Sequence, residues 1–325
     1  MHKKIIRWGI IGCGNVTEVK SGPPYQQTEG FELKAVMRRT LSKAEDYAVR
    51  HGVPLFYDDA ATLINHPEVD AVYIATPPDS HHQYALQVAE AGKICCIEKP
   101  LAPSYEESKA IVAAFEAKRL PLFVAYYRRS LPRFLQIKQW LDIGEIGEVR
   151  HVSWHLSSPP SDIDLSKKYN WRTDVKVAPG GYFDDLACHG LDLFTYLLGN
   201  ITEVKGISQN QQGFYDAKDA ITACWQHSGG VTGTGNWNFG AASKEEKVTI
   251  YGSKGKISFS VFAEAPLVLE NEEGSHELHV AHPRHIQHHY VGAMQAQLSG
   301  GKPHPSTGAT AAHTSWVMDH ILGTL

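Results

Sequence analysis

Residues 5–17 read IIRWGIIGCGNVT, an apolar run that ends in a turn with two glycines. Such a run is typical of a strand that is buried on both faces of a parallel sheet. In a dinucleotide-binding turn, Gly12 makes the tight bend and Gly14 lets the backbone approach a pyrophosphate at the next helix N-terminus. The segment therefore predicts a dinucleotide site at the first strand–helix junction, with Gly12, Gly14, Asn15 and Val16 as cofactor contacts.

The residues after this turn depart from the usual pattern. Thr17 stands where a third glycine or an alanine is common, so an ordinary glycine-rich turn is the alternative interpretation. Residues 22–24, Gly-Pro-Pro, are expected to break or kink the first helix early. Lys20 then lies near the turn, either in contact with phosphate or substrate or as a solvated surface lysine.

The first 125 residues alternate between short apolar runs and helical patterns. This alternation implies βαβ units and a parallel sheet of the Rossmann type. Ser104 and Glu107 form a candidate capping box at the start of one helix. The pattern predicts strands at 5–11, 33–37, 71–75, 94–97 and 122–125, and helices at 42–51, 80–91 and 104–118.

Beyond residue 126 the runs are longer and alternate between apolar and polar residues. This is typical of an open, mostly antiparallel sheet with one solvated face, so we predict an α/β chain with domains 1–125 and 126–325, the second of α+β type. The polar segment 157–176 is expected to be a long loop over the site. Strands are predicted at 148–156, 202–209, 220–227, 231–239, 244–251 and 256–262, and helices near 130–143, at 180–198 and after residue 289.

The composition is that of an ordinary globular protein. The 325 residues include 31 Lys and Arg against 35 Asp and Glu, a formal charge of −4, with 42% hydrophobic residues. The mild acidity gives no footprint of a nucleic-acid binder, and no apolar run approaches the length of a membrane span. Five scattered cysteines without a CxxC pair are typical of reduced thiols, so we expect a cytoplasmic protein.

Two arginines follow the second predicted strand. A site selective for NAD usually has Asp or Glu at this place, where it binds the ribose 2′-hydroxyl. Here Arg38 and Arg39 stand there instead, and guanidinium groups can pair with a 2′-phosphate and stack on adenine. The pair favours NADP over NAD, although a basic surface turn with the cofactor read elsewhere is the alternative.

Three further motifs occur in order along the chain. Glu98-Lys99-Pro100 ends the fourth predicted strand, after Ala75-Thr76-Pro77-Pro78 and His81. Residues 180–192 read GGYFDDLACHGLD, and residues 304–308 read HPSTG. Together with the glycine turn, these motifs resemble the Gfo/Idh/MocA oxidoreductase family over the whole chain. The resemblance implies an N-terminal Rossmann domain and a C-terminal domain whose open sheet commonly packs homodimers or homotetramers.

The resemblance implies catalytic roles for Lys99, Asp185 and His189. Lys99 lies at the carboxyl end of a central strand, where open α/β sheets bind ligands, and a lysine there can hold a substrate oxygen. Asp185 and His189 are four residues apart and so share one helix face, where the histidine can exchange a proton near neutral pH. An exposed strand-end lysine and a structural histidine are the alternatives. Asp192 is expected either to support these catalytic side chains without touching the substrate or only to stabilise the helix.

Other residues are expected to line the site. Further cofactor contacts are predicted at Thr76, Pro77, His81, Glu98 and Lys99. Glu98 is expected either to orient Lys99 or to cap the next helix. The bond before Pro100 is a candidate for the cis form. Substrate contacts are predicted at Lys99, Tyr127, Arg172, Asp185 and His189. Tyr127 stands where many family members have Asn, and it either reaches the nicotinamide or substrate or packs at the domain seam. Pro179 and Ala187 replace two glycines of the family pattern, with little expected effect.

Six histidines lie within residues 276–289 and suggest a zinc site. Pro283 breaks a continuous helix there, and no Cys or Asp joins the set, so a solvated loop explains the cluster better. We therefore expect no metal.

The predicted reaction moves hydride between C4 of the nicotinamide and a carbon that bears a hydroxyl or carbonyl group. The resemblance implies a sugar, inositol or related polyol as the substrate. Two other functions remain open: an NAD-dependent, redox-neutral glycosidase, and a nucleotide-binding regulator without enzymatic activity.

Overall fold

The computed structural model describes residues 5–325. They form two compact units, the first reaching Ser130 and also including Pro283–Ala312, the second comprising Leu131–His282 and His313–Leu325. The predicted division into 1–125 and 126–325 differs from this mainly at Pro283–Ala312, which returns to the first unit. A helical pattern in this segment does not by itself say which unit the helix packs against.

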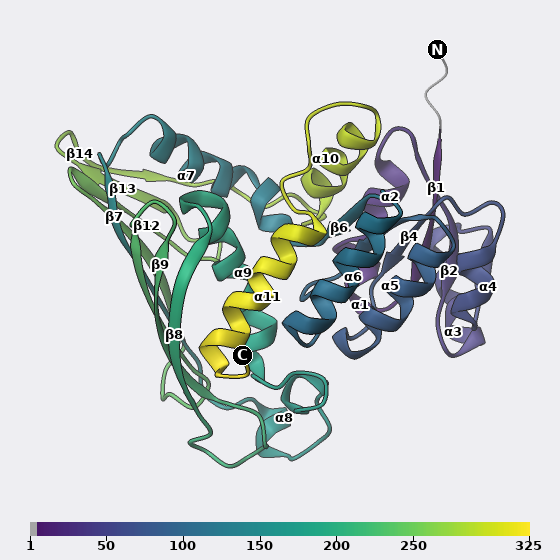
Figure 1. Cartoon of the computed structure of the whole chain (residues 1–325), viewed down its shortest axis with the longest axis horizontal. Helices are drawn as coiled ribbons and strands as arrows, with labels where there is room; N and C mark the ends of the chain where they lie inside the picture. Colours follow the sequence, from purple (N-terminus) through teal and green to yellow (C-terminus); the bar gives the residue numbers. More distant parts are fainter. Residues whose placement is uncertain (1–4) are drawn as a thin grey trace. The chain divides into compact units, whose positions relative to one another are not determined.

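The first unit is built on a parallel sheet of six strands, in the order β3-β2-β1-β4-β5-β6. This is the strand order of a doubly wound dinucleotide-binding fold, as predicted. Figure 1 labels β1, β2, β4 and β6 of this sheet. The weak three-residue strand β3 was not predicted, because three residues carry too little pattern. The strands are β1 (Ile6–Ile11), β2 (Phe31–Met37), β3 (Leu55–Tyr57), β4 (Ala71–Ile74), β5 (Ile94–Ile97) and β6 (Leu122–Val124).

The first helix of this unit breaks as predicted, whereas the helix at Ala60–Asn65 (α4) was not predicted. The first helix ends early, and a second begins with prolines in its first turn, as residues 22–24 predicted. Ser104 caps α6 by accepting a hydrogen bond from the Glu107 amide at 3.3 Å. The helices are α1 (Asn15–Val19), α2 (Gly22–Gln27), α3 (Leu41–His51), α4 (Ala60–Asn65), α5 (His81–Glu90) and α6 (Tyr105–Ala117), with 3₁₀ turns at Pro78–Ser80 and Tyr127–Ser130.

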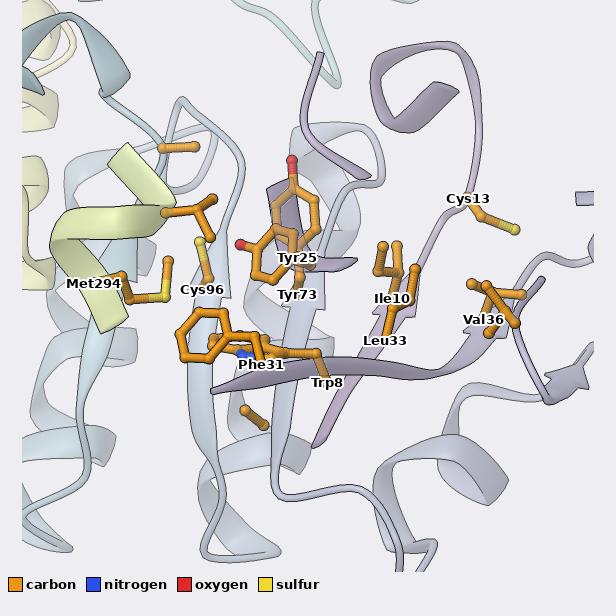
Figure 2. Close-up of a cluster of buried hydrophobic side chains, with 14 of the residues drawn as sticks. Trp8, Ile10, Cys13, Tyr25, Phe31, Leu33, Val36, Tyr73, Cys96 and Met294 are labelled. Atoms are coloured by element: carbon orange, nitrogen blue, oxygen red, sulfur yellow. The ribbon is translucent and has the colours of Figure 1, made fainter. Parts of the chain in front are cut away.

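Aromatic side chains form part of the core of the first unit. The rings of Trp8 and Tyr25 lie 4.8 Å apart, and those of Tyr25 and Tyr73 stack at 5.0 Å. Figure 2 shows these side chains together with Met294, which reaches the same core from α10 (His288–Leu298). Burial of this apolar surface explains why the late segment belongs to the first unit.

The second unit contains a sheet of eight strands in the order β14-β13-β12-β11-β7-β10-β9-β8 (Figure 1). Only β7 and β10 pair in parallel, and the other neighbours are antiparallel, as predicted. Neither strand of the last hairpin was predicted: β13 has only five residues, and β14 is exposed throughout and has no apolar alternation. The strands are β7 (Val149–Ser157), β8 (Ile201–Gln209), β9 (Ala220–His227), β10 (Thr232–Asn238), β11 (Glu245–Gly252), β12 (Gly255–Phe259), β13 (Leu267–Asn271) and β14 (Gly274–Leu278).

Helices cover one face of this sheet. A Cβ atom on Gly190 would lie 2.4 Å from the Trp154 ring, so only glycine lets α9 (Tyr182–Leu198) approach β7 this closely. Along β9 and β10 buried and exposed side chains alternate, so the opposite face is open. The remaining helices are α7 (Pro132–Asp142), the short α8 (Asp162–Leu165), a 3₁₀ turn at Trp171–Thr173 and α11 (Gly308–Leu322). Within residues 5–325 no helix has both the length and the apolar character needed to cross a membrane.

Candidate active site

The glycine turn between β1 and α1 has the form that a dinucleotide requires. Gly12 has a φ of +90°, and a Cβ atom there would lie 2.7 Å from Cγ2 of Thr76. A Cβ atom on Gly14 would meet only the Gly12 carbonyl oxygen, at 3.7 Å, so this side of the turn is open. The open space lies at the N-terminus of α1, where backbone amides favour an anion. The turn therefore fits a pyrophosphate.

Thr17 replaces the third glycine without disturbing the turn. Its hydroxyl donates to the Gly14 carbonyl oxygen at 2.9 Å, and its own carbonyl oxygen accepts from the Tyr47 hydroxyl at 2.9 Å. The close backbone approach occurs at Gly22 instead, where an added Cβ atom would lie 2.2 Å from the Thr17 carbonyl oxygen. The departure from the usual fingerprint is thus compensated locally.

Arg38 follows β2 and lies beside the turn. Its Nη1 atom is 3.5 Å from the Cys13 carbonyl oxygen, and the side chain is half-buried, whereas Arg39 is exposed. Burial raises the pKa of the Cys13 thiol to about 11, against the opposing effect of the Arg38 charge, so this thiol stays neutral. The positive charge of Arg38 lies at the edge of the turn, on the side where a dinucleotide-binding fold places the ribose.

His81 joins two turns at the carboxyl edge of the sheet. Its ring is buried, with Nε2 2.9 Å from the Thr76 carbonyl oxygen and Nδ1 3.0 Å from that of Pro100. Burial lowers the pKa of this histidine. The contacts are to backbone, so His81 shapes the turn that carries Thr76 and the exposed Pro77. A cofactor contact by its side chain stays a prediction.

Glu98 is a buried carboxylate directly beyond β5. Its Oε1 atom accepts hydrogen bonds from the Tyr73 hydroxyl at 2.5 Å and from Nε2 of Gln287 at 2.7 Å. Its Oε2 atom accepts from the Lys99 amide at 3.2 Å. Glu98 was predicted either to orient Lys99 or to cap the next helix. Its contacts fit the first role, since the cap of α6 is Ser104. The Lys99–Pro100 bond is cis.

The second unit places Asp185 and His189 on successive turns of α9. Asp185 forms an ion pair with Arg172, whose Nε atom lies 2.7 Å from Oδ2. The Arg172 guanidinium also stacks over the Trp171 ring, 4.4 Å from its centroid. His189 is 5% exposed and its ring meets that of Phe262 edge-on at 6.0 Å. The structure thus brings two predicted substrate contacts, Arg172 and Asp185, into direct contact.

The start of α9 is fixed by its own first turn. Gly181 has a φ of +65°, and the Gly180 amide donates to Oδ2 of Asp184 at 2.7 Å. Burial is the largest cause that raises the pKa of Asp184 to about 7, with the carboxylates of Asp319 and Asp185 adding to it. Asp184 is therefore a second acid at this helix terminus, which the sequence analysis did not single out.

The loop at 157–176 is anchored to the same helix. Ser161 and Asp164 form a capping box at the start of α8. The Tyr182 hydroxyl donates to Asp164 at 2.9 Å and accepts from the Asn170 side-chain amide at 2.9 Å. Hydrogen bonds to α9 therefore hold the loop that carries Arg172.

The remaining predicted residues are placed as follows. Asp192 is buried and accepts from the Thr314 hydroxyl at 3.2 Å, which ties α9 to α11. Tyr127 is half-buried beside the core of the first unit, with the Arg128 guanidinium 5.0 Å from its ring centroid. The Lys20 side chain is exposed. Lys99 and Tyr127 belong to the first unit, and Arg172, Asp185 and His189 to the second.

The histidines at 276–289 are spread over different elements. His276 lies in β14, His288 and His289 begin α10, and Nδ1 of His285 lies 2.6 Å from the Val19 carbonyl oxygen. Across the described part of the chain, no three His, Cys, Asp or Glu side chains gather in a way that could hold a metal ion.

The fold and the turn define a dinucleotide-binding protein of the Rossmann class, and comparison with known proteins gives its family and the oxidoreductase class. Residues 6–126 match the model of the Gfo/Idh/MocA oxidoreductase family with its NAD-binding Rossmann fold, and residues 134–258 match the family's C-terminal domain. A protein named oxidoreductase P35 from Formosa agariphila is 37% identical over 98% of this chain and 99% of its own. The chain belongs to the Gfo/Idh/MocA family.

Two other relatives have more specific names. The scyllo-inositol 2-dehydrogenase (NAD(+)) of Bacillus subtilis is 26% identical over 83% of this chain and 78% of its own. A structure of levoglucosan dehydrogenase in complex with NADH and levoglucosan superposes with a TM-score of 0.85 at 23% identity, covering 99% of this chain and 97% of that one. This structural similarity confirms the fold of both units.

Proposed function

We propose that this oxidoreductase transfers hydride between NADP and a carbon of a sugar, inositol or related polyol that bears a hydroxyl or carbonyl group. The observation that carries the proposal is the half-buried Arg38 beside the open glycine turn. The names of the relatives, a scyllo-inositol 2-dehydrogenase and a levoglucosan dehydrogenase, support the substrate class.

The preference for NADP rests on the charge at the end of β2. Arg38 occupies the place of the acidic residue that would bind an unmodified ribose, and Arg39 adds a second charge in solvent. An acidic residue would repel a 2′-phosphate, whereas a guanidinium pairs with it through two hydrogen bonds. NAD is the alternative cofactor, and NADH is the one named in the complex of the structural relative.

The chain's own residues would handle the substrate oxygen. When bound, the nicotinamide supplies the carbon that accepts or delivers hydride. Lys99 would hold the reacting oxygen, and His189 would exchange its proton as general acid and base. Asp185, fixed by Arg172, would bind a hydroxyl group of the substrate. Tyr127 and Arg172 complete the proposed substrate contacts.

We also propose that a second copy of the chain covers the open face of the larger sheet. A depression of about 510 Å³ on this face is lined by residues of β7, β8, β9 and β10. Ile207 is 70% exposed there, a large apolar side chain left in solvent by the isolated chain. A homodimer or homotetramer would bury it. None of the five cysteines, which all lie within residues 5–325, forms a disulfide, which supports a cytoplasmic location.

The first test is a fluorescence titration of the purified protein with NADPH and with NADH, followed by turnover on a panel of sugars and polyols. Tight NADPH binding and turnover with NADP are expected. Binding that favours NADH would contradict the Arg38 argument and leave the reaction class intact. Tightly retained nucleotide, with glycoside cleavage and no net redox change, would favour a redox-neutral glycosidase instead.

A further inference from the structure

Gln287 is a buried side chain that no sequence motif indicated. It is 1% exposed and precedes α10 as its N-cap residue. Its Nε2 atom donates to Oε1 of Glu98 at 2.7 Å, across 189 positions of sequence. Burying a polar amide is costly, and the hydrogen bond to Glu98 offsets part of this cost, although Oε1 of Gln287 has no hydrogen-bond partner within the described residues.

The segment around Gln287 also contacts the helix behind the glycine turn. The Gln287 amide donates to the Lys20 carbonyl oxygen at 3.2 Å, and the His285 ring lies against the Val19 carbonyl oxygen at 2.6 Å. One residue therefore binds the end of α1 with its backbone and Glu98 with its side chain. Both contacts lie within the first unit.

Glu98 in turn holds the backbone of Lys99. Its Oε2 atom accepts the Lys99 amide at 3.2 Å, while Oε1 is occupied by Tyr73 and Gln287. Removal of Gln287 leaves Oε1 with only the Tyr73 hydroxyl among these donors. A buried carboxylate that loses one of its three donors moves toward another hydrogen-bonding partner, and this movement releases the Lys99 backbone from its position.

We propose that Gln287 is a positioning residue: it holds Glu98, and through Glu98 the backbone of Lys99, at a fixed position relative to the helix that follows the glycine turn. The inference rests on the proposed role of Lys99 in turnover. The proposal gives the segment Pro283–Ala312 a role in catalysis, although this segment lies outside both the Glu98-Lys99-Pro100 motif and the motif at residues 180–192.

The test compares Gln287→Met, which keeps the length and removes the donor, with Gln295→Met as control. Gln295 lies on the same helix, where its Nε2 atom donates to the Ser299 hydroxyl. For Gln287→Met we expect kcat to fall about 10- to 100-fold while KM for the substrate changes less than about threefold, because a misplaced group slows the reaction more than it weakens binding. The control should match the wild type.

A second variant gives a signature that a purely structural role would not produce. In Gln287→Glu the introduced carboxyl group can donate a hydrogen bond to Glu98 only while it is protonated. The ratio of its kcat to that of the wild type should therefore approach one at low pH and fall as pH rises. This variant also serves if Gln287→Met does not fold.

Hydrogen–deuterium exchange separates this inference from the proposed function. The Lys99 amide should exchange about tenfold faster in Gln287→Met than in the wild type or in the control, whether or not a substrate is known. A wild-type protein without turnover on any sugar or polyol would overturn the proposed function, and the exchange rate would still decide the role of Gln287. Wild-type exchange at Lys99 together with an unchanged kcat and pH profile would overturn the inference.

Discussion

Nε of Arg172 lies 2.7 Å from Oδ2 of Asp185, and the aspartate side chain in this pair is only 15% exposed. The guanidinium comes from a loop and the carboxylate from a helix, so the ion pair joins the polar segment at 157–176 to α9. Replacing Arg172 with Gln should lower kcat/KM about 10- to 100-fold, because Asp185 loses the group that orients it. Steady-state kinetics on the best substrate of the panel measures this.

Arg150→Gln is the matched control for that variant. Arg150 pairs with Glu148 on the surface of the same unit, where both side chains are well exposed. Exposed pairs of this kind contribute little, so kcat/KM should stay within about twofold of the wild type. Equal losses in the two variants would mean that the Arg172–Asp185 pair has no special role.

Two glycines of the first turn should respond differently to alanine. At Gly14 a Cβ atom meets nothing closer than 3.7 Å, so Gly14→Ala should fold like the wild type but bind NADPH and NADH about tenfold or more weakly, because the methyl group occupies pyrophosphate space. Gly12→Ala should lower the Tm, because Gly12 has a φ of +90° and an added Cβ atom would clash with the Thr76 side chain. Thermal melts and nucleotide titrations distinguish the two, and unchanged nucleotide binding in Gly14→Ala would contradict the proposed pyrophosphate position.

Arg38→Gln tests the choice of cofactor. Loss of a charged hydrogen-bonding partner should raise the Kd for NADPH about tenfold or more and change that for NADH by less than about threefold. Arg39→Gln, which removes an exposed charge, should have the smaller effect of the two. The same fluorescence titration serves both variants, and equal weakening of the two nucleotides would indicate a contact outside the 2′-phosphate.

Asp184 should make stability depend on pH. Its pKa rises from an ordinary 3.8 to about 7 on folding, chiefly through burial, so the folded chain holds this proton more tightly than the unfolded chain. The resulting stabilisation is complete below about pH 4 and is lost as pH rises through about 7. Between pH 4 and pH 8 the wild type should therefore lose more stability than Asp184→Asn, by roughly 4 kcal/mol for a shift of this size.

Urea unfolding of both proteins at pH 4, 6 and 8 measures this difference. The stability gap between wild type and Asp184→Asn should widen across the series. Asp216→Asn, at an exposed position, is the control and should follow the wild type. Parallel pH dependences for wild type and Asp184→Asn would show that Asp184 does not titrate in this range.

Ile207→Asp should disrupt the proposed oligomer. A charge in the centre of an apolar contact is costly, so light scattering should show a smaller assembly than for the wild type. Val49→Asp changes a side chain that is 76% exposed on α3 of the first unit, and should leave the mass unchanged. A monomeric wild type, or an Ile207→Asp variant of wild-type mass, would refute the second copy on this sheet face.

The sequence predicts best the parts of the fold in which local pattern and burial agree. β5 and β9 have the predicted limits, and the first helix ends at Val19, just before the Gly-Pro-Pro at residues 22–24. The three-residue β3 and the fully exposed β14 escape prediction, since their residues carry no periodicity. Tertiary pairing, not local preference, makes these two strands.

The candidate site shows the same division. The glycine turn, Lys99, Asp185 and His189 are recognisable because short motifs mark them. Gln287 has no motif, and only the fold of the return segment brings it to Glu98, from 189 positions away in sequence. A periodic pattern predicts that a helix forms near residue 290 but not which partner it meets.

The chain passes from one unit to the other three times, after Ser130, His282 and Ala312. A fragment that ends at residue 130 would lack the helix that brings Met294 to the aromatic core, and Glu98 would lose its amide partner. The nucleotide-binding half is therefore not a cassette that can be excised or exchanged at a single junction. Chimeras that aim to transplant its cofactor preference onto another member must carry both of its separate stretches of sequence.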